Sequence, residues 1–167
     1  SGQQWTMSDD ATADRNLALE SVRVTEAAAI AASRFVGGGD EIVADQAAVD
    51  AMHKALQRLA LKGTVRIGEG TKGEADKLYV GERLGTGDGP KVDIALVALE
   101  GTTIVARGGP NALSVIAMAE DGGFLTVPSV YMDKIAVGPG LPEGIVDLDR
   151  EPAENLGALS EAKGTPV

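Results

Sequence analysis

The first sixty residues carry apolar positions at helical spacing. One stretch, 14–36, is rich in Ala and stops at three consecutive glycines, which is typical of a helix end. A second stretch, 42–60, repeats apolar residues at steps of three and four and closes at Lys62-Gly63. The pattern predicts two helices, whose apolar faces carry Leu17, Val24, Ala28 and Ala31 in the first and Val49, Met52, Leu56 and Leu59 in the second.

Most of the remaining chain has the pattern of strands. The run 92–99 is almost continuously apolar, as expected of a strand that is buried on both faces. Other short apolar runs are bounded by Gly, Pro and Asp, including a hairpin-like turn at Asp121-Gly122-Gly123. Pro152 in a first turn marks a last helix, and 78–84 fits either strand or loop. We expect strands at 64–67, 92–99, 112–119, 124–127, 135–137 and 144–148, and a final helix at 151–163.

This order of elements, helices first and then mostly strands, favours an α+β fold over repeated βαβ units. We expect layered helices on a mixed, largely antiparallel sheet. Residues 14–167 are predicted to form a single domain, and 1–13 to be a tag or a disordered N-terminus. The last residues, Ala162-Lys-Gly-Thr-Pro-Val167, resemble a helix stop that leads into something further, which predicts a truncation at a domain boundary.

Composition narrows the classes of partner. The net charge of −10 argues against nucleic acid and anionic membranes as partners, because both carry negative charge. The absence of Cys excludes disulfides and thiolate metal sites, and it fits a cytoplasmic protein. No apolar run is long enough to predict a membrane span. Aromatic residues make up only 3% of the chain, so the core must consist of Ala, Val, Leu and Ile.

Three acidic residues stand at the ends of predicted elements. Asp45 lies near the start of the second helix, Glu69 follows a strand between two glycines, and Glu100 follows another strand. Oxygen ligands of this kind suit Mg²⁺ or Mn²⁺. Gly101 and Thr102 directly follow Glu100; their backbone N–H groups could bind a phosphate, and the Thr102 hydroxyl could orient a water.

Each of these residues also has a structural interpretation. Asp45 can interact favourably with the dipole at the start of the second helix, and Glu69 can be an exposed turn residue. Glu-Gly-Thr alone is a weak signal. His53, the single His, is interpreted as a solvated helix residue, since one His makes neither a triad nor a zinc site. Tyr131, taken by itself, is more often structural than a ligand contact.

A set of motifs in fixed order resembles the N-terminal part of class II fructose-1,6-bisphosphatases, some of which also act on sedoheptulose-1,7-bisphosphate. The resemblance covers about 14–164, and the family protein is roughly twice as long. The motifs are Asp14-Arg-Asn-Leu-Ala-Leu-Glu, Val22-Arg-Val-Thr-Glu-Ala-Ala, Ala44-Asp-Gln-Ala-Ala-Val-Asp-Ala-Met, Ile67-Gly-Glu-Gly, Gly85-Thr-Gly-Asp-Gly-Pro, Leu99-Glu-Gly-Thr-Thr, Pro110-Asn-Ala-Leu and Tyr131-Met-Asp-Lys-Ile-Ala-Val-Gly-Pro-Gly.

The resemblance implies the first domain of the metal-dependent sugar and inositol phosphatase superfamily, with the family's second domain absent. It implies Mg²⁺ or Mn²⁺ as cofactor, a sugar bisphosphate as substrate, and removal of the 1-phosphate by an activated water. By motif, Asp45, Glu69 and Glu100 match metal ligands, and Glu100, Gly101 and Thr102 match the phosphate-binding turn. Glu100 and Thr102 are thus the candidate catalytic residues, and Tyr131 matches a substrate contact.

The chain departs from the family where the chemistry is expected. The family has Asp-Pro-x-Glu-Gly-Thr, whereas here Val97-Ala98-Leu99-Glu100 replaces a metal-ligand Asp with Val and removes the Pro. A lost bridging ligand would cost several kcal/mol of transition-state stabilisation, on the order of 10³-fold in rate. We therefore expect an impaired or inactive phosphatase domain. The alternatives are a non-catalytic scaffold or binding module, degenerate or engineered, and a weak phosphate or metal binder; homo-oligomers are compatible with each.

Overall fold

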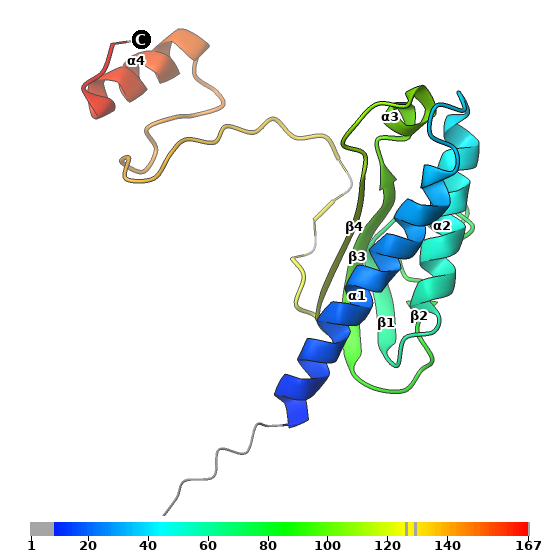
Figure 1. The fold of residues 1–167 in the computed structure, drawn as a ribbon. Coiled ribbons are helices and arrows are strands. Elements are labelled where there is room, and N and C mark those ends of the chain that lie inside the picture. The colour runs from blue at the N-terminus through cyan, green and yellow to red at the C-terminus, as the bar shows by residue number, and fades with distance from the viewer. Residues whose placement is uncertain (1–8, 126, 129, 167) are drawn as a thin grey trace, which may run out of the picture. The chain divides into compact units, whose positions relative to one another are not determined.

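The computed structural model describes residues 9–125, 127, 128 and 130–166, and it confirms the α+β class (Figure 1). The chain divides into two compact units, 1–126 and 127–167. The smaller unit holds the helix α4 (Pro152–Lys163). The larger unit holds the helices α1 (Asp9–Ser33), α2 (Glu41–Leu56) and α3 (Thr102–Arg107), and the strands β1 (Lys62–Ile67), β2 (Arg83–Leu84), β3 (Lys91–Glu100) and β4 (Leu113–Glu120).

The two long helices form as their apolar spacing predicts. The first helix begins at Asp9, five residues ahead of the predicted start, and the second begins at Glu41. Asp40 explains the second start, because its carboxylate accepts a hydrogen bond from the Val43 N–H at 3.0 Å. Residues 1–8 of the predicted tag or disordered segment, 1–13, lie outside the described residues. A single domain over 14–167 stays a prediction.

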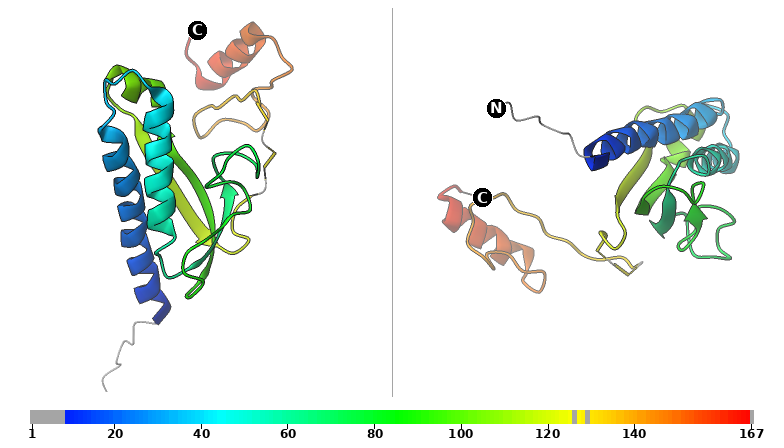
Figure 2. Two further views of the ribbon diagram at one scale, coloured as in Figure 1. Left: turned by 90° about the vertical axis from the view of Figure 1, so that its right-hand side faces the viewer. Right: turned by 90° about the horizontal axis from the view of Figure 1, so that it is seen from below.

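The sheet is mixed, in the order β2-β1-β3-β4. Its central pair, β1 and β3, runs parallel, whereas β2 and β4 pair antiparallel with them. Both views in Figure 2 place α1 and α2 side by side on one face of this sheet. The core lies between these layers, and its largest fully buried side chains include Met52, Leu56, Leu61, Val65 and Ile94.

The second face of the sheet is less apolar and partly open. Along β4, Ile116 and Met118 pack against the core, whereas Val115, which directly precedes Ile116 and points to the other face, is 44% exposed. Val97 of β3 is half-buried and pairs directly with Val115. Buried Asp93 accepts hydrogen bonds from Arg66 Nε and from the Gly122 N–H, both at 2.8 Å, which ties β1 and the turn after β4 to β3.

Three of the predicted short strands are wrong. The described residues of 124–127, and all of 135–137 and 144–148, have irregular backbone. A strand needs a hydrogen-bonded neighbour. Pro139 and Pro142 have no N–H to donate, and the glycines around them favour turns. The final helix is confirmed: Pro152 begins it, and Glu151 and Glu154 form a reciprocal capping box.

Candidate functional site

Two of the three predicted acidic residues lie at the same edge of the sheet because β1 and β3 are parallel. Glu69 follows the end of β1, and Glu100 is the last residue of β3. Asp45 joins them from the beginning of α2. Burial is the main reason that the pKa of Glu69 is raised, and the charges of Asp45 and Glu100 add to it, so each of these two carboxylates lies within electrostatic reach of Glu69.

Glu69 is the most constrained of the three acids. Its Oε1 accepts a hydrogen bond from the Ala98 N–H at 2.8 Å, which holds the carboxylate against β3. Burial is the largest influence on Glu69 and raises its pKa, whereas the Ala98 hydrogen bond opposes that shift. Burial also raises the pKa of Asp45. Both groups are thus carboxylates whose charge is poorly compensated, which is the condition that a bound cation relieves.

The oxygen donors have the right chemistry for a hard cation, but the set is incomplete. Within the part of the chain that the structure describes, no three His, Asp or Glu side chains lie close enough to hold a metal ion. Val97 directly precedes Ala98, the residue whose N–H binds Glu69, and it offers only a hydrocarbon side chain at this position. Three acids therefore share an edge of the sheet without forming a closed cage.

The Glu100-Gly101-Thr102 turn connects β3 to α3. Gly101 has φ +95°, a left-handed conformation that other residues rarely adopt, and it precedes the first residue of the helix. The Thr102 hydroxyl donates a hydrogen bond to Glu41 Oε2 at 3.4 Å. The Thr102 oxygen thereby keeps its lone pairs for accepting another hydrogen bond, for example from a water.

Two contributors were missed from the sequence. Glu41, which accepts from Thr102, is visible there only as an acidic residue in the first turn of a helix. The Ala98 N–H, a backbone group, leaves no sequence signal at all. Tyr131 belongs to the smaller unit and is fully exposed there, so its substrate contact stays a prediction.

The interpretation of His53 as a solvated helix residue is wrong. Its side chain is only 22% exposed, and its Nε2 lies 2.9 Å from Glu82 Oε1. The sequence separates these partners by 29 residues, so helical periodicity around His53 could not reveal the pair.

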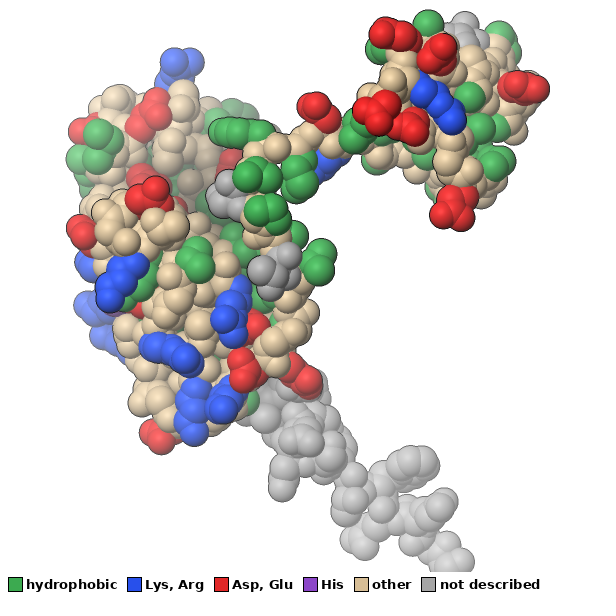
Figure 3. All heavy atoms as spheres, turned by 180° about the vertical axis from the view of Figure 1, so that it is seen from behind, with side chains coloured by type: hydrophobic (Ala, Val, Ile, Leu, Met, Phe, Trp, Pro, Cys, Tyr) green, Lys and Arg blue, Asp and Glu red, His purple; other side chains and the backbone are tan. Residues whose placement is uncertain are grey.

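Positive charge gathers away from the candidate site. Lys62 and Lys91 are exposed and pair directly at the starts of β1 and β3, the end of the sheet opposite to Glu69 and Glu100. Figure 3 shows Lys and Arg side chains collected over the lower part of the larger unit.

Among the described residues, no helix is both long and apolar enough to cross a membrane.

Comparison with known proteins supplies a family for this arrangement. The family described as "Bacterial fructose-1,6-bisphosphatase, glpX-encoded" matches residues 15–167. The chain is 47% identical over 153 residues to "Fructose-1,6-bisphosphatase 1 class 2" of Escherichia coli (strain K12), with 92% of this chain and 45% of the relative covered. The same values hold for "Fructose-1,6-bisphosphatase class 2" of Shigella flexneri. The chain thus spans about half the length of the curated relatives that it matches.

Proposed function

Because the chain belongs to the bacterial, glpX-encoded fructose-1,6-bisphosphatase family, we propose that it carries the metal and phosphate site of a sugar-bisphosphate phosphatase, impaired at Val97. The substrate is fructose 1,6-bisphosphate, as the names of the relatives indicate. One observation carries the proposal: β1 and β3 run parallel, so Glu69 and Glu100 come to the same end of the sheet, where the Glu-Gly-Thr turn begins and where burial, Asp45 and Glu100 all raise the pKa of Glu69.

Each residue has a distinct role in this proposal. Asp45, Glu69 and Glu100 are the residues that would hold Mg²⁺ or Mn²⁺, and their side chains would have to move closer together to do so, since among the described residues no three such groups are near enough. When bound, the ion would supply Lewis-acid stabilisation of phosphate oxygens. The backbone N–H groups of Gly101 and Thr102 bind the phosphate. Thr102 donates its only hydroxyl proton to Glu41, so its oxygen accepts a hydrogen bond from water and orients that water.

Val97 explains the expected impairment. A Val side chain cannot coordinate a cation, so the three remaining acids bind the ion less tightly than a complete set. The loss of one electrostatic contact of this kind costs on the order of 10²–10³-fold in rate. The chain is therefore expected to turn over slowly, with activity limited by the incomplete ligand set.

Manganese-dependent release of phosphate from fructose 1,6-bisphosphate tests this proposal. We expect slow turnover that Glu100→Ala abolishes and that Val97→Asp raises by about 10²–10³-fold. Glu120→Ala is the matched control, because Glu120 is also an exposed strand-terminal acid but lies at the opposite end of the sheet. Turnover that survives Glu100→Ala would show that the activity does not come from this site.

A non-catalytic binding module is the second candidate function. Ile42 is 80% exposed and Val43 is 41% exposed in the first turn of α2, one turn before Asp45. Exposed apolar residues beside an incomplete acidic site suit protein contact better than catalysis. No phosphate release by the chain, and none by Val97→Asp, would favour this module. Calorimetric titration with Mn²⁺ then separates an inert module from a weak metal binder.

A further inference from the structure

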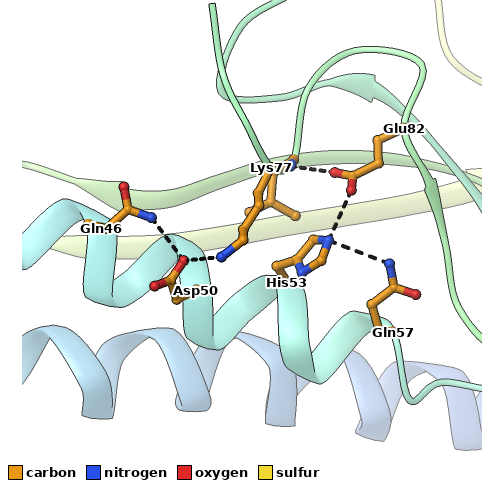
Figure 4. Close-up of polar contacts among 7 residues, drawn as sticks. Gln46, Asp50, His53, Gln57, Lys77 and Glu82 are labelled. Carbon is orange, nitrogen blue, oxygen red and sulfur yellow. Dashed lines mark hydrogen bonds and ion pairs between the residues drawn. The ribbon is translucent and has the colours of Figure 1, made fainter. Parts of the chain in front are cut away.

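Glu82 connects α2 to the long loop that follows β1. One of its carboxylate oxygens lies 2.9 Å from His53 Nε2, and the other accepts a hydrogen bond from the Leu78 N–H. Figure 4 shows His53 on α2 and Glu82 on the loop pointing toward each other. The Glu82 side chain is only 12% exposed, so this pair is shielded from water much more than a surface ion pair.

Leu78 is held in an unusual conformation at the centre of that loop. Its φ is +58°, a left-handed value that costs a non-glycine residue about 1 kcal/mol, yet its side chain is fully buried. Its carbonyl lies so close to Gly68 that a Cβ on Gly68 would sit 2.1 Å from the oxygen. Burial of the Leu78 side chain and the Glu82 hydrogen bond thus fix the backbone against Gly68.

The fixed backbone leads directly to Glu69. The Leu78 carbonyl accepts a hydrogen bond from the Glu69 N–H at 3.0 Å, and the Glu69 carboxylate reaches the Ala98 N–H on β3. The contacts run without a gap from His53 through Glu82 and Leu78 to Glu69. We infer that His53 and Glu82 are positioning residues that set where the Glu69 carboxylate lies. The contribution of Glu69 to metal binding rests on the proposed function, whereas its placement does not.

A second link between the same loop and the same helix provides a control. Lys77 Nζ lies 2.7 Å from Asp50 Oδ1, and Figure 4 shows this pair beside the His53 pair. Both side chains are considerably exposed, at 39% and 49%, and exposed pairs contribute little. Asp50→Ala therefore removes one α2–loop contact while leaving the contacts among Glu82, Leu78 and Glu69 in place.

Amide hydrogen exchange of the metal-free chain, read by NMR, tests the inference. The Ala98 N–H bonds to Glu69, so its exchange rate reports the position of that carboxylate, and the N–H of buried Ile94 on the same strand reports general opening. In Glu82→Ala we expect Ala98 exchange to rise about 10-fold relative to Ile94. Glu82→Gln should restore most of the protection, because its amide oxygen still accepts from Leu78. Asp50→Ala should stay within about twofold of the parent chain.

The outcomes separate positioning from general stabilisation. If Ala98 and Ile94 accelerate in proportion, the pair only stabilises the fold and the inference is overturned. If Glu82→Ala does not fold, His53→Ala tests the inference instead. In that variant we expect the exchange rate of the Ala98 N–H to rise about threefold relative to that of Ile94. Calorimetry with Mn²⁺ alone then tests the site: a selective rise at Ala98 with no Mn²⁺ binding by the parent chain would sink the proposed function and leave the positioning intact.

Discussion

Replacing Val97 by Asp would place a carboxylate at the position where we propose that a metal ligand is missing. The structure predicts that this change has opposite effects on stability without and with a divalent cation. Without the ion, the new carboxylate joins an edge where Asp45 and Glu100 already raise the pKa of Glu69. With the ion, the same carboxylate becomes a ligand and the repulsion is relieved.

The size of the metal-free effect follows from the surroundings of Val97. The side chain is half-buried, and full burial of a Val side chain contributes roughly 1.5–3 kcal/mol, so about 1 kcal/mol is lost. The cross-strand contact with Val115 adds about 0.2–1 kcal/mol. We expect Val97→Asp to lower the free energy of unfolding by about 1–2 kcal/mol, and repulsion from the neighbouring acids acts in the same direction.

Metal binding should reverse that loss. A ligand at 100 times its Kd stabilises the folded state by about 2.7 kcal/mol, which exceeds the expected cost. Urea unfolding in chelator and in excess Mn²⁺ measures both quantities, with a metal-free midpoint about 0.5–1 M urea lower than that of the parent chain. The parent should gain less from Mn²⁺, because its ligand set is smaller.

Val97→Asn is the matched control, since it removes the same apolar contact without adding a charge. It should lose about 1–2 kcal/mol of stability, without the added repulsion, and regain little of it in Mn²⁺. If Val97→Asp gains no more from Mn²⁺ than Val97→Asn does, then the position does not face the cation site and the reasoning fails. Equal stability of the Asp and parent chains in chelator would refute the estimate of burial and repulsion.

Three further changes test other parts of the structure. Burial and neighbouring charges raise the pKa of Glu69 in the folded chain. The parent should therefore lose stability as pH rises from below about 4.3 through that raised pKa. Glu69→Gln should reduce this dependence of stability on pH and should raise the midpoint of urea unfolding at pH 7. The Arg66 hydrogen bond lowers the pKa of Asp93 in the folded chain. The contribution of Asp93 to stability is therefore present above about pH 3.9 and is lost as pH falls through its lowered pKa. In acid titrations followed by circular dichroism, Asp93→Asn should reduce the dependence of stability on pH in that range. Met52→Ala should lower the unfolding free energy by about 2–5 kcal/mol in urea, because the side chain is fully buried.

The long elements could be predicted because solvent and core impose a periodic pattern on them. Val49, Met52 and Leu56 recur at helical steps and all lie in the core, and the apolar run of β3 lies in the centre of the sheet. Short elements carry no such pattern. The six-residue α3 depends on tertiary contacts, since the N–H groups of Gly37 and Gly39 donate to carbonyls of that helix.

The false strands show the converse error. Val137 and its neighbours have high strand propensity, but propensity only describes a residue that already has a pleated partner. The same limit applies to the candidate site. The sequence shows that acidic residues stand at the ends of predicted elements. It does not show that Glu69 and Glu100 lie close together, because that depends on the parallel pairing of β1 and β3, which no local sequence pattern predicts.

Convergence of acids also has a cost in stability when no cation is bound. Burial and two neighbouring negative charges raise the pKa of Glu69, and the hydrogen bond from the Ala98 N–H opposes that shift. A fourth carboxylate would add repulsion in every metal-free molecule and would help only while an ion is bound. Val97 adds no charge and pairs across the strands with another apolar residue, Val115. Stability and metal affinity should therefore change in opposite directions at position 97, which makes Val there favourable to the fold for the same reason that it is unfavourable to the chemistry.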